Sequence, residues 1–415
     1  MYQRALVSVS NKDGLVEFLK PLADKGLQIV STGGTAKYLK ENGFQVVDVS
    51  DITKFPEVMD GRVKTLHPNI HMGLLARANH SEDIKTLSQF NVDVFDLVVV
   101  NLYPFEESLK KNLAFEEMIE KIDIGGPSML RSAAKSFSRI TVVCDPTDYS
   151  EVLNQSAEDV NFKKKLAAKV FYHTSQYDSL IANYLNPENK DYYIVSGRLH
   201  KKLRYGENPT QAAYWYKNIQ SGRGFHDFEI IQGKELSYNN LLDLDSALEL
   251  CLELKETNAV AVKHNNPCGV AYGKSADQII SQLVTTDPVS IFGGIVAVNF
   301  ELTHTEAEKL NEIFLECIVA PSYTNEALQV FSKKKNLRVM KYSQEYFVSE
   351  AMIKSIRGGF LIQDQDSFDL TPSEWKFLGL KPNEEIMRDL LFGEKICGYL
   401  KSNSIALVDN GKTIG

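Results

Sequence analysis

A regular alternation of short apolar runs with amphipathic stretches constrains the fold of this chain more than any other feature. The run FDLVVVNL at 95–102 is almost wholly apolar, which is typical of a parallel strand covered on both faces. Apolar residues between 15 and 22 instead follow the i, i+3, i+4 spacing of a helix, which Gly26 can end. Strands that alternate with helices predict a three-layer α/β domain. The strands expected there are 4–9, 28–30, 44–49, 95–102 and 140–144, with a second helix that ends near Asn42.

A long helix and a polar stretch divide the chain. Apolar residues between 161 and 184 keep a helical period, and the polar segment NPENKD follows at 186–191. We therefore expect one domain over 1–195 and a second α/β domain over 196–415. The elements expected in the second domain are strands at 259–263, 295–299 and 317–320, and a helix opened by a capping box from Thr303 to Glu306.

Length and charge limit the classes of function. The 415 residues suit two or three domains, and 43% hydrophobic with 24% charged residues is typical of a soluble globular protein. The formal net charge of −8 would repel nucleic acid and anionic lipid, so we expect neither as a general partner. Small anions can still bind in local pockets.

The five cysteines stand singly, and none forms a CxxC pair. This pattern favours neither a disulfide framework nor a zinc site, and it fits a reducing cytoplasm. No stretch of about 18 apolar residues occurs, so we expect no membrane span, and we recognise no export signal in the first residues.

The last residues predict a β-hairpin. SNSIALV at 402–408 is typical of a strand, DNGK at 409–412 of a type I′ turn, and TIG at 413–415 of the start of a return strand. A hairpin with one arm cut short is an unusual terminus for a natural protein. We therefore expect this chain to be a fragment or a truncated form of a longer protein.

The pentapeptide STGGT at 31–35 follows one expected strand and opens a helix. Its two glycines allow close backbone approach, its hydroxyls add donors, and a helix N-terminus favours an anion, so the segment suits a phosphate. The alternative is a tight strand-to-helix turn with an ordinary cap. The segment matches neither Walker A nor GxGxxG, which disfavours hydrolysis of a nucleoside triphosphate.

Further polar residues follow the other strands of this domain. Ser10 and Lys12 come after the first strand, where α/β folds collect ligands. The segment 61–68 carries two cations and a hydroxyl, NLYPF at 101–105 ends the buried run, and DIGGP at 123–127 precedes a helix. Each by itself could be structural, as a capped turn, a solvated basic loop or a tyrosine tip in water. Together they favour acid/base chemistry on a phosphorylated small molecule.

Lys263 and His264 stand directly after an expected strand of the second domain, in the polar segment KHNNPCG. The neighbouring ammonium favours the neutral imidazole, so the pair is a candidate for proton transfer. The alternative is a histidine with a structural role. Arg204, in LRYGENP at 203–209, is a candidate ligand for a phosphate.

The Pro267-Cys268 pair invites comparison with zinc deaminases, whose signature is HxE followed by PCxxC. Position 271 is alanine here, and Asn266 stands two residues after His264 in place of glutamate. Because the metal ligands and the general acid/base are both missing, we expect no zinc. Cys268 as a nucleophile is a weaker alternative, since only His264 could activate it.

The longest motifs carry a resemblance to a known family. SVSNK, STGGTAKYL, GRVKTLHPNIHMGLLAR, NLYPF and DIGGPSMLRSAAK resemble the cyclohydrolase domain of the bifunctional purine-biosynthesis proteins that join IMP cyclohydrolase to AICAR transformylase (phosphoribosylaminoimidazolecarboxamide formyltransferase). LRYGENPTQ, VKHNNPCGVA, FGGIVAVN, IVAPSY and SNS resemble their transformylase. The resemblance covers essentially all 415 residues, in the same order.

The resemblance implies a methylglyoxal-synthase-like N-terminal domain, followed by a cytidine-deaminase-like transformylase region without zinc. It implies a cytoplasmic homodimer with transformylase sites at the subunit interface. It also implies 10-formyltetrahydrofolate as cosubstrate, and AICAR, formyl-AICAR, IMP and reduced folate as the small molecules bound. The family's proteins continue past the GKTIG segment into a stretch that contributes to the second site, and this stretch is absent here.

The same resemblance implies residues for formyl transfer. The aromatic amine of AICAR is a poor nucleophile, so proton removal and stabilisation of the oxyanion must both be supplied. His264 is implied as proton acceptor, with Lys263 and Asn403 orienting and polarising the formyl group. The residues implied to bind the substrate are Arg204 and Tyr205 at its phosphate and Phe292, Gly293 and Glu316 at its imidazole carboxamide.

Residues for cyclisation are implied in the first domain. Ring closure joins two groups of one molecule, so the protein need only hold the folded conformer and manage protons. The residues implied for proton transfer and oxyanion stabilisation are Lys64, Tyr103, Asp123 and Lys135. The residues implied to bind the substrate are Ser10, Lys12, Ser31, Thr32, Gly33, Gly34, Thr35, Arg62, Thr65, Asn101, Gly125 and Gly126.

Two other classes of protein stay open. A purine-nucleotide binding protein would keep these pockets without the chemistry. In this chain the alternative applies best to the second domain, which would bind AICAR without turnover. A zinc deaminase is the other alternative, and stoichiometric zinc in the purified protein would support it.

Overall fold

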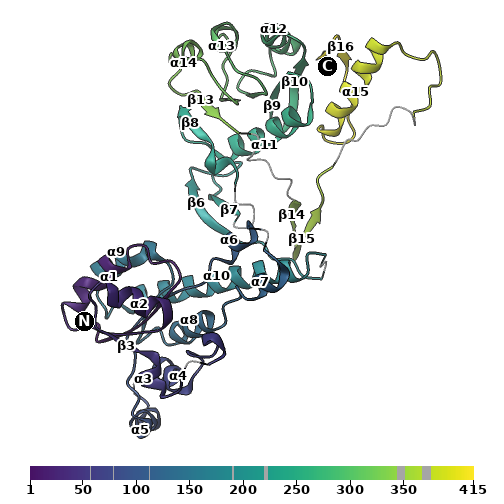
Figure 1. The fold of residues 1–415 in the computed structure, drawn as a ribbon. Helices are drawn as coiled ribbons and strands as arrows, with labels where there is room; N and C mark the ends of the chain where they lie inside the picture. Colours follow the sequence, from purple (N-terminus) through teal and green to yellow (C-terminus); the bar gives the residue numbers. More distant parts are fainter. Residues whose placement is uncertain are drawn as a thin grey trace. The chain divides into compact units, whose positions relative to one another are not determined.

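The computed structural model describes residues 1–56, 58–77, 79–111, 113–188, 191–218, 223–343, 351–366 and 375–415. The chain divides into two compact units, Met1–Ile194 and Val195–Gly415, and each is described by itself (Figure 1). The border expected from sequence stands one residue away from this division, although positions 189 and 190 of the NPENKD segment lie outside the described residues. That each unit carries one activity stays a prediction.

The first unit contains a five-stranded parallel sheet. Its strands are β1 (Arg4–Val9), β2 (Gln28–Ser31), β3 (Val46–Asp48), β4 (Leu97–Asn101) and β5 (Thr141–Val143). Their order in the sheet is β3-β2-β1-β4-β5. All five expected strands are confirmed, but β3 is shorter than 44–49, because the chain turns at Val49 into a short helix that buries this side chain.

Helices cover both faces of this sheet. They are α1 (Leu15–Ala23), α2 (Gly33–Glu41), α3 (Val49–Thr53), η1 (Met59–Gly61), α4 (Pro68–Leu75), α5 (Ser81–Phe90), α6 (Phe105–Leu109), α7 (Phe115–Ile119), α8 (Gly125–Lys135), η2 (Pro146–Asp148), α9 (Tyr149–Asn154) and α10 (Val160–Leu185). Side chains of β4 alternate between two cores: Val99 packs in a cluster with Phe18 of α1, and Val98 in a cluster with Leu130 of α8. The three-layer arrangement expected from sequence is therefore confirmed.

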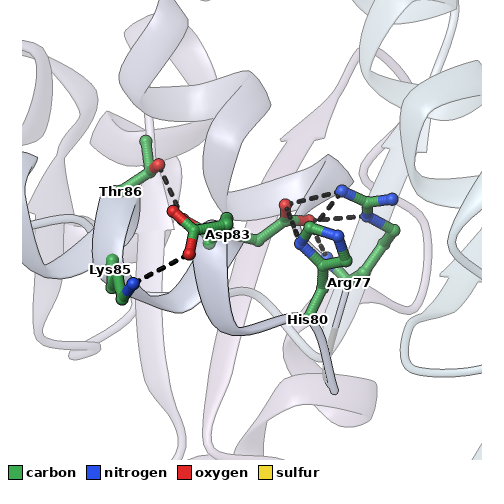
Figure 2. Close-up of polar contacts among 6 residues, drawn as sticks. Arg77, His80, Asp83, Lys85 and Thr86 are labelled. Atoms are coloured by element: carbon green, nitrogen blue, oxygen red, sulfur yellow. Dashed lines mark hydrogen bonds and ion pairs between the residues drawn. The ribbon is translucent and has the colours of Figure 1, made fainter.

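A polar cluster orders the start of α5 (Figure 2). The Asp83 carboxylate accepts hydrogen bonds from the Arg77 backbone (2.9 Å), from Arg77 Nε (2.9 Å) and from Arg77 Nη2 (2.8 Å). His80 Nδ1 lies 2.9 Å from the same carboxylate. These contacts lower the pKa of Asp83, chiefly through the Arg77 side chain. The cluster holds the turn before α5 and is exposed to solvent, so we assign it a local structural role.

The second unit contains a mixed eight-stranded sheet. Its strands are β8 (Glu229–Gln232), β9 (Asn258–Lys263), β10 (Asn266–Tyr272), β11 (Ile295–Val298), β12 (Cys317–Ala320), β13 (Arg338–Lys341), β16 (Val408–Asp409) and β17 (Lys412–Thr413). The order is β16-β17-β10-β9-β11-β12-β13-β8. The three strands expected from sequence are confirmed as β9, β11 and β12, which are neighbours in the sheet.

Helices and two small sheets complete the second unit. The helices are η3 (Phe225–Asp227), α11 (Tyr238–Glu253), α12 (Ala276–Thr286), α13 (His304–Asn311), α14 (Asn325–Phe331) and α15 (Glu384–Gly398). The two-stranded sheets pair β6 (Gly197–Leu203) with β7 (Ala213–Asn218), and β14 (Met352–Ile356) with β15 (Gly359–Gln363). The expected capping box opens α13, since the Thr303 backbone donates to Glu306 Oε2 at 3.0 Å.

The expected C-terminal hairpin is present, but its first arm is much shorter than 402–408. Asn410 and Gly411 have φ angles of 49° and 74°, as a type I′ turn requires. Pairing begins only at Leu407, whose backbone N–H donates to Gly415 at 2.7 Å. The preceding residues are drawn to the end of α15, where Ser404 Oγ donates to the Cys397 carbonyl at 3.4 Å. A local side-chain hydrogen bond of this kind competes with strand pairing, and the expected strand is present only at β16.

None of the helices in the described part of the chain has the length and apolar character that crossing a membrane requires.

Candidate active sites

The first candidate site lies at the carboxyl edge of the first sheet. β1 stands between β2 and β4. The strands β2 and β3 extend the sheet on one side of β1, and β4 and β5 extend it on the other, so the strand order reverses at β1. Open α/β sheets bind ligands at such a switch point, outside the carboxyl ends of the strands. The segments that follow these three strands are 8–12, 31–35 and 101–103, which are three of the segments that the sequence singled out.

The STGGT segment leaves the start of α2 open to a ligand. Thr32 is the N-cap residue, but its side chain makes no capping hydrogen bond in the described structure. The backbone N–H groups of the first turn are therefore available to an anion. A Cβ atom on Gly33 would lie 2.8 Å from Lys64 Nζ, and Gly33 has a φ of 55°. The Lys64 ammonium thus lies against the glycine backbone, beside the open helix end.

Two hydroxyls of the same segment face inward. Ser31 is fully buried, and its Oγ donates to the Val7 carbonyl at 2.7 Å. Thr35 Oγ1 donates to the Val9 carbonyl at 2.9 Å and accepts from the Val9 backbone N–H at 3.0 Å. These side chains fasten the segment to β1, so their hydroxyls are already used within the protein.

Asn101 has a comparable role on the other side of β1. Its Oδ1 accepts hydrogen bonds from the backbone N–H groups of Ser10 (2.6 Å) and Asn11 (3.0 Å), and its Nδ2 donates to the Asn11 carbonyl at 2.8 Å. The amide therefore holds the loop that carries Ser10 and Lys12. The Lys12 ammonium donates to the Ser10 carbonyl at 3.3 Å.

Asp123 stands just before α8, and hydrogen bonds hold both its carboxylate and its backbone. Its Oδ1 accepts from the Gly126 backbone N–H at 2.8 Å, and its own backbone N–H donates to the Tyr177 hydroxyl at 2.7 Å. Burial raises the pKa of Asp123, although backbone hydrogen bonds from Gly126 and Tyr103 act in the opposite direction. A partly buried carboxyl with a raised pKa beside a site is suited to proton transfer.

The remaining predicted residues of this unit are placed unequally. A Cβ atom on Gly125 would lie only 2.6 Å from Thr65 Oγ1, so the Thr65 side chain packs against the start of α8. Arg62 forms an ion pair with Glu120. Lys135 is exposed at the opposite end of α8. A rise of about 1.5 Å per residue places it about 15 Å along the helix axis from Gly125. The structure therefore does not bring Lys135 to Asp123 within this unit.

Two cavities adjoin this group of residues. The smaller has a volume of about 50 Å³ and lies between the STGGT segment and the start of α3; the larger, of about 470 Å³, lies between the start of α8 and the end of α10. Lys64 lines the first and Asp123 the second.

The second candidate site lies at the turn between β9 and β10. His264 and Asn265 have φ angles of 55° and 57°, the left-handed pair of a two-residue type I′ turn. Lys263, the last residue of β9, directs its Nζ to the Phe292 carbonyl at 2.8 Å. The sequence predicted Lys263 and His264 at the end of the strand, and the structure places them there. It did not predict the tight turn.

Asp243 on α11 contacts this turn and was missed by sequence reasoning. Its Oδ2 accepts from the His264 backbone N–H at 3.3 Å, and its Oδ1 accepts from the Asn265 backbone N–H at 2.7 Å. The residue stands 20 positions or more before the turn, in a segment with no ligand-like motif. The available signal for such a residue was the histidine-asparagine pair. If the pair forms a type I′ turn, its exposed backbone N–H groups need an acceptor, which Asp243 supplies.

Phe292, Gly293 and Glu316 lie together beside Lys263. The ring of Phe292 lies 5.2 Å from that of Phe314, and Gly293, with a φ of 79°, donates its N–H to the Phe314 carbonyl at 2.7 Å. The Glu316 backbone N–H donates to the Gly294 carbonyl at 3.0 Å. These contacts join the loop before β11 to the segment before β12.

Glu316 has a partner that the sequence did not indicate. Arg338 Nη1 lies 2.6 Å from Glu316 Oε2, and the same buried guanidinium donates twice to the Glu235 carbonyl at 3.0 Å. The Glu316 carboxylate is thereby oriented by β13. Its position in space is set by this ion pair and by its backbone hydrogen bonds.

Other predicted residues of the second unit have contacts of their own. The Arg204 guanidinium stacks 5.4 Å from the ring of Tyr205, and its segment is tied to α11 where Asn239 Nδ2 donates to the Glu207 carbonyl at 3.3 Å. Asn403 is exposed. No hydrogen bond or ion pair connects it to Lys263 or His264 among the described residues.

Cys268 is poorly suited to be a nucleophile. Burial raises the pKa of its thiol to about 11, and its Sγ donates to the Ala261 carbonyl at 3.5 Å. A thiol with such a pKa is protonated at neutral pH and therefore weakly nucleophilic. In the part of the chain that the structure describes, no group of three or more His, Cys, Asp or Glu side chains could hold a metal ion.

Comparison with known proteins finds two family models, whose matches meet within the first unit rather than at the border between the units. The model of the MGS-like domain matches residues 14–128, and that of the AICARFT/IMPCHase bienzyme matches residues 133–415. The bifunctional purine biosynthesis protein PurH of Caldicellulosiruptor saccharolyticus is 46% identical over 439 residues, and that of a Thermoanaerobacter species 48% over 425. Each alignment covers 100% of this chain and 84% of the relative. This chain belongs to the AICARFT/IMPCHase bienzyme family.

Membership of this bienzyme family settles the class of activity. The chain is an enzyme with formyltransferase and cyclohydrolase activities, which are the last two steps of IMP synthesis, and the expected α/β fold with an MGS-like N-terminal domain is confirmed. The PurH protein of Clostridium perfringens is also 46% identical, over 423 residues. Among solved structures, that of ForH is 30% identical and covers 45% of this chain and 100% of that chain, with a TM-score of 0.40.

Proposed function

We propose that the first unit closes formyl-AICAR to IMP with the residues gathered at its sheet edge. The carboxamide nitrogen attacks the formyl carbon of the same molecule, and water leaves after proton transfer. The observation that carries this proposal is a series of close approaches: Lys64 lies against Gly33, Thr65 against Gly125 and Asp123 against Gly126. These approaches connect the phosphate-competent helix end with the partly buried carboxyl of Asp123.

In this proposal the substrate phosphate binds at the start of α2. The backbone N–H groups of Gly33 and Gly34 would donate to it, together with Thr32, Ser10 and Lys12. Ser31 and Thr35 shape the segment from behind, because their hydroxyls bond to β1. The residues proposed to support the rest of the substrate are Arg62, Thr65, Asn101, Gly125 and Gly126.

Asp123 is the proposed base of the cyclisation. The backbone N–H groups that bond its carboxylate favour its ionised form, whereas burial favours the protonated form and raises the pKa of Asp123 above its ordinary value. Lys64 and Tyr103 would stabilise the oxyanion. Lys135 has the weakest support of the four residues, because it stands at the other end of α8.

The second unit would transfer the formyl group of 10-formyltetrahydrofolate to the amine of AICAR. His264 accepts the amine proton, and Lys263 and Asn403 polarise the formyl carbonyl. The hydrogen bond from Lys263 to the Phe292 carbonyl supports this scheme, because it places an ammonium beside the proposed carboxamide pocket. The residues proposed for substrate binding are Arg204, Tyr205, Phe292, Gly293 and Glu316.

A homodimer in a reducing cytoplasm is also proposed. All five cysteines, each within the described residues, are free thiols, which suits a reducing compartment. The exposed β14–β15 hairpin supports the dimer, because a second copy would cover its apolar side chains.

Paired assays of two variants test the division of labour. Lys64→Ala should slow IMP formation from formyl-AICAR at least tenfold, while AICAR-dependent release of tetrahydrofolate stays within twofold of wild type. His264→Ala should give the opposite pattern. Loss of both reactions in either variant, with normal folding by circular dichroism, would contradict the two-site scheme.

A second candidate, binding of AICAR without turnover in the second unit, is favoured by the exposed position of Asn403. Calorimetric binding of AICAR together with no measurable release of tetrahydrofolate would select it over formyl transfer.

A further inference from the structure

The turn that carries His264 has an unusual backbone. Residues other than glycine rarely adopt a positive φ, and a histidine followed by an asparagine does so here at both central positions of the turn. Such conformations persist only where the surrounding structure holds them, and they gather at functional sites. Something beyond the two side chains must therefore stabilise this turn.

The Asp243 carboxylate meets that need. One oxygen accepts from His264 N–H at 3.3 Å and the other from Asn265 N–H at 2.7 Å. With the Asn265 amide in the orientation that satisfies its neighbours, Nδ2 also donates to Asp243 Oδ1 at 3.2 Å. A carboxylate is acceptor-only and strengthens bonds from N–H groups, so it suits two parallel backbone donors.

The helix that carries Asp243 is itself well anchored. Leu244, Ala247 and Leu248 of α11 are fully buried against the second sheet. From its first turn, Asn239 Nδ2 donates to the Glu207 carbonyl of the Arg204 segment. The same helix thus contacts both the segment that carries the proposed phosphate ligand and the turn that carries the proposed proton acceptor.

We infer that Asp243 is a positioning residue for formyl transfer: its carboxylate holds the 264–265 turn in the left-handed conformation and so aims the His264 imidazole at the substrate amine. The inference rests on the proposed function of His264. In this scheme Asp243 takes no proton from the substrate and acts only through the backbone N–H groups that it accepts from.

Kinetics of Asp243→Ala in the full chain test the positioning role. The kcat of formyl transfer should fall about 10- to 100-fold, as expected for a displaced reacting group, with the KM for AICAR within threefold and cyclisation within twofold of wild type. Asp245→Ala is the matched control, since it removes the same charge two residues along α11, on another side of the helix. Equal kcat values in the two variants would overturn the inference.

A rescue experiment separates backbone positioning from an electrostatic effect of the charge. Glycine adopts a positive φ without strain, so adding Asn265→Gly to Asp243→Ala should restore the turn and recover at least a fifth of the wild-type kcat. If the double variant stays as slow as Asp243→Ala, Asp243 does not act through the turn, and the inference fails.

Hydrogen exchange gives a readout that needs no activity. In wild type, the amides of His264 and Asn265 should exchange at least tenfold more slowly than in Asp243→Ala, and the Asp245→Ala control should match wild type. Equal exchange in wild type and Asp243→Ala would overturn the inference even if the chain transfers no formyl group. Full formyl transfer by His264→Ala would instead refute the proposed function, while the exchange data would still show whether Asp243 holds the turn.

Discussion

At the scale of single residues, close backbone approaches organise the first site. A Cβ on Gly126 would lie 2.5 Å from Asp123 Oδ2 and 2.7 Å from the Leu102 side chain, distances that real Cβ atoms do not show. The absence of a side chain at this position lets the carboxylate lie against the start of α8. Leu102 belongs to the core, so it has little freedom to move away.

Gly126→Ala should therefore displace the Asp123 carboxylate and lower the rate of cyclisation at least tenfold, a loss typical of a misplaced catalytic group. Formyl transfer by the same protein should be unchanged. Gly379→Ala is a suitable control, because a Cβ there would meet nothing within 4 Å. Wild-type cyclisation by Gly126→Ala would show that the position of Asp123 does not matter.

The raised pKa of Asp123 predicts a pH dependence. Burial moves the pKa of this carboxyl above its ordinary value of about 3.9, so it keeps its proton to a higher pH than an exposed aspartate. Since the proposed base must be ionised, the rate of cyclisation should rise with pH through the raised pKa and then level off. Asp123→Asn should remove this rise from the pH–rate profile. A rate that falls with pH across the same range would assign Asp123 as an acid instead.

At the scale of secondary-structure elements, Arg139 joins a helix end to the sheet. Its guanidinium donates to the Gly73 carbonyl at 3.1 Å and the Leu74 carbonyl at 2.9 Å, and also to the carbonyls of Ala76 and Phe95. The last carbonyls of a helix have no partner within the helix. One side chain thus satisfies the end of α4 and fastens it beside β4.

Arg139→Met should lower the free energy of unfolding of the first unit by about 2–4 kcal/mol, because several partly buried carbonyls would lose a charged donor. Urea denaturation followed by far-UV circular dichroism would measure the change. Lys37→Met removes a positive charge from a side chain that is 79% exposed and should change stability by less than about 0.5 kcal/mol. A similar small effect for Arg139→Met would mean that solvent replaces its hydrogen bonds.

At the scale of the whole molecule, the β14–β15 hairpin exposes apolar side chains on both of its faces. Ile353 and Ile362 pair directly across it and are 43% and 40% exposed, and Leu361 on the opposite face is 56% exposed. An isolated two-stranded hairpin is marginally stable in water. Both of its apolar faces would gain from cover, which supports the proposed homodimer.

Ile353→Ser combined with Ile362→Ser should therefore weaken self-association. We expect the midpoint concentration of the monomer–dimer transition, measured by sedimentation velocity, to rise at least tenfold. Substituting Lys354→Ser, on the other face of the hairpin, should have a smaller effect. An unchanged transition in the double variant would exclude the hairpin from the interface.

The sequence by itself determined the elements and the local motifs of this protein. Apolar runs such as 95–102 and the helical period of 161–184 specify strands and helices because burial and backbone geometry act over neighbouring residues. The STGGT segment and the Lys263-His264 pair were found for the same reason. Only the tertiary structure decided that Ser31 and Thr35 turn inward, that Lys135 stands away from Asp123, and that Asp243 holds the turn at His264. Those outcomes depend on sheet order and helix packing, which bring together residues whose separation along the chain carries no local signal.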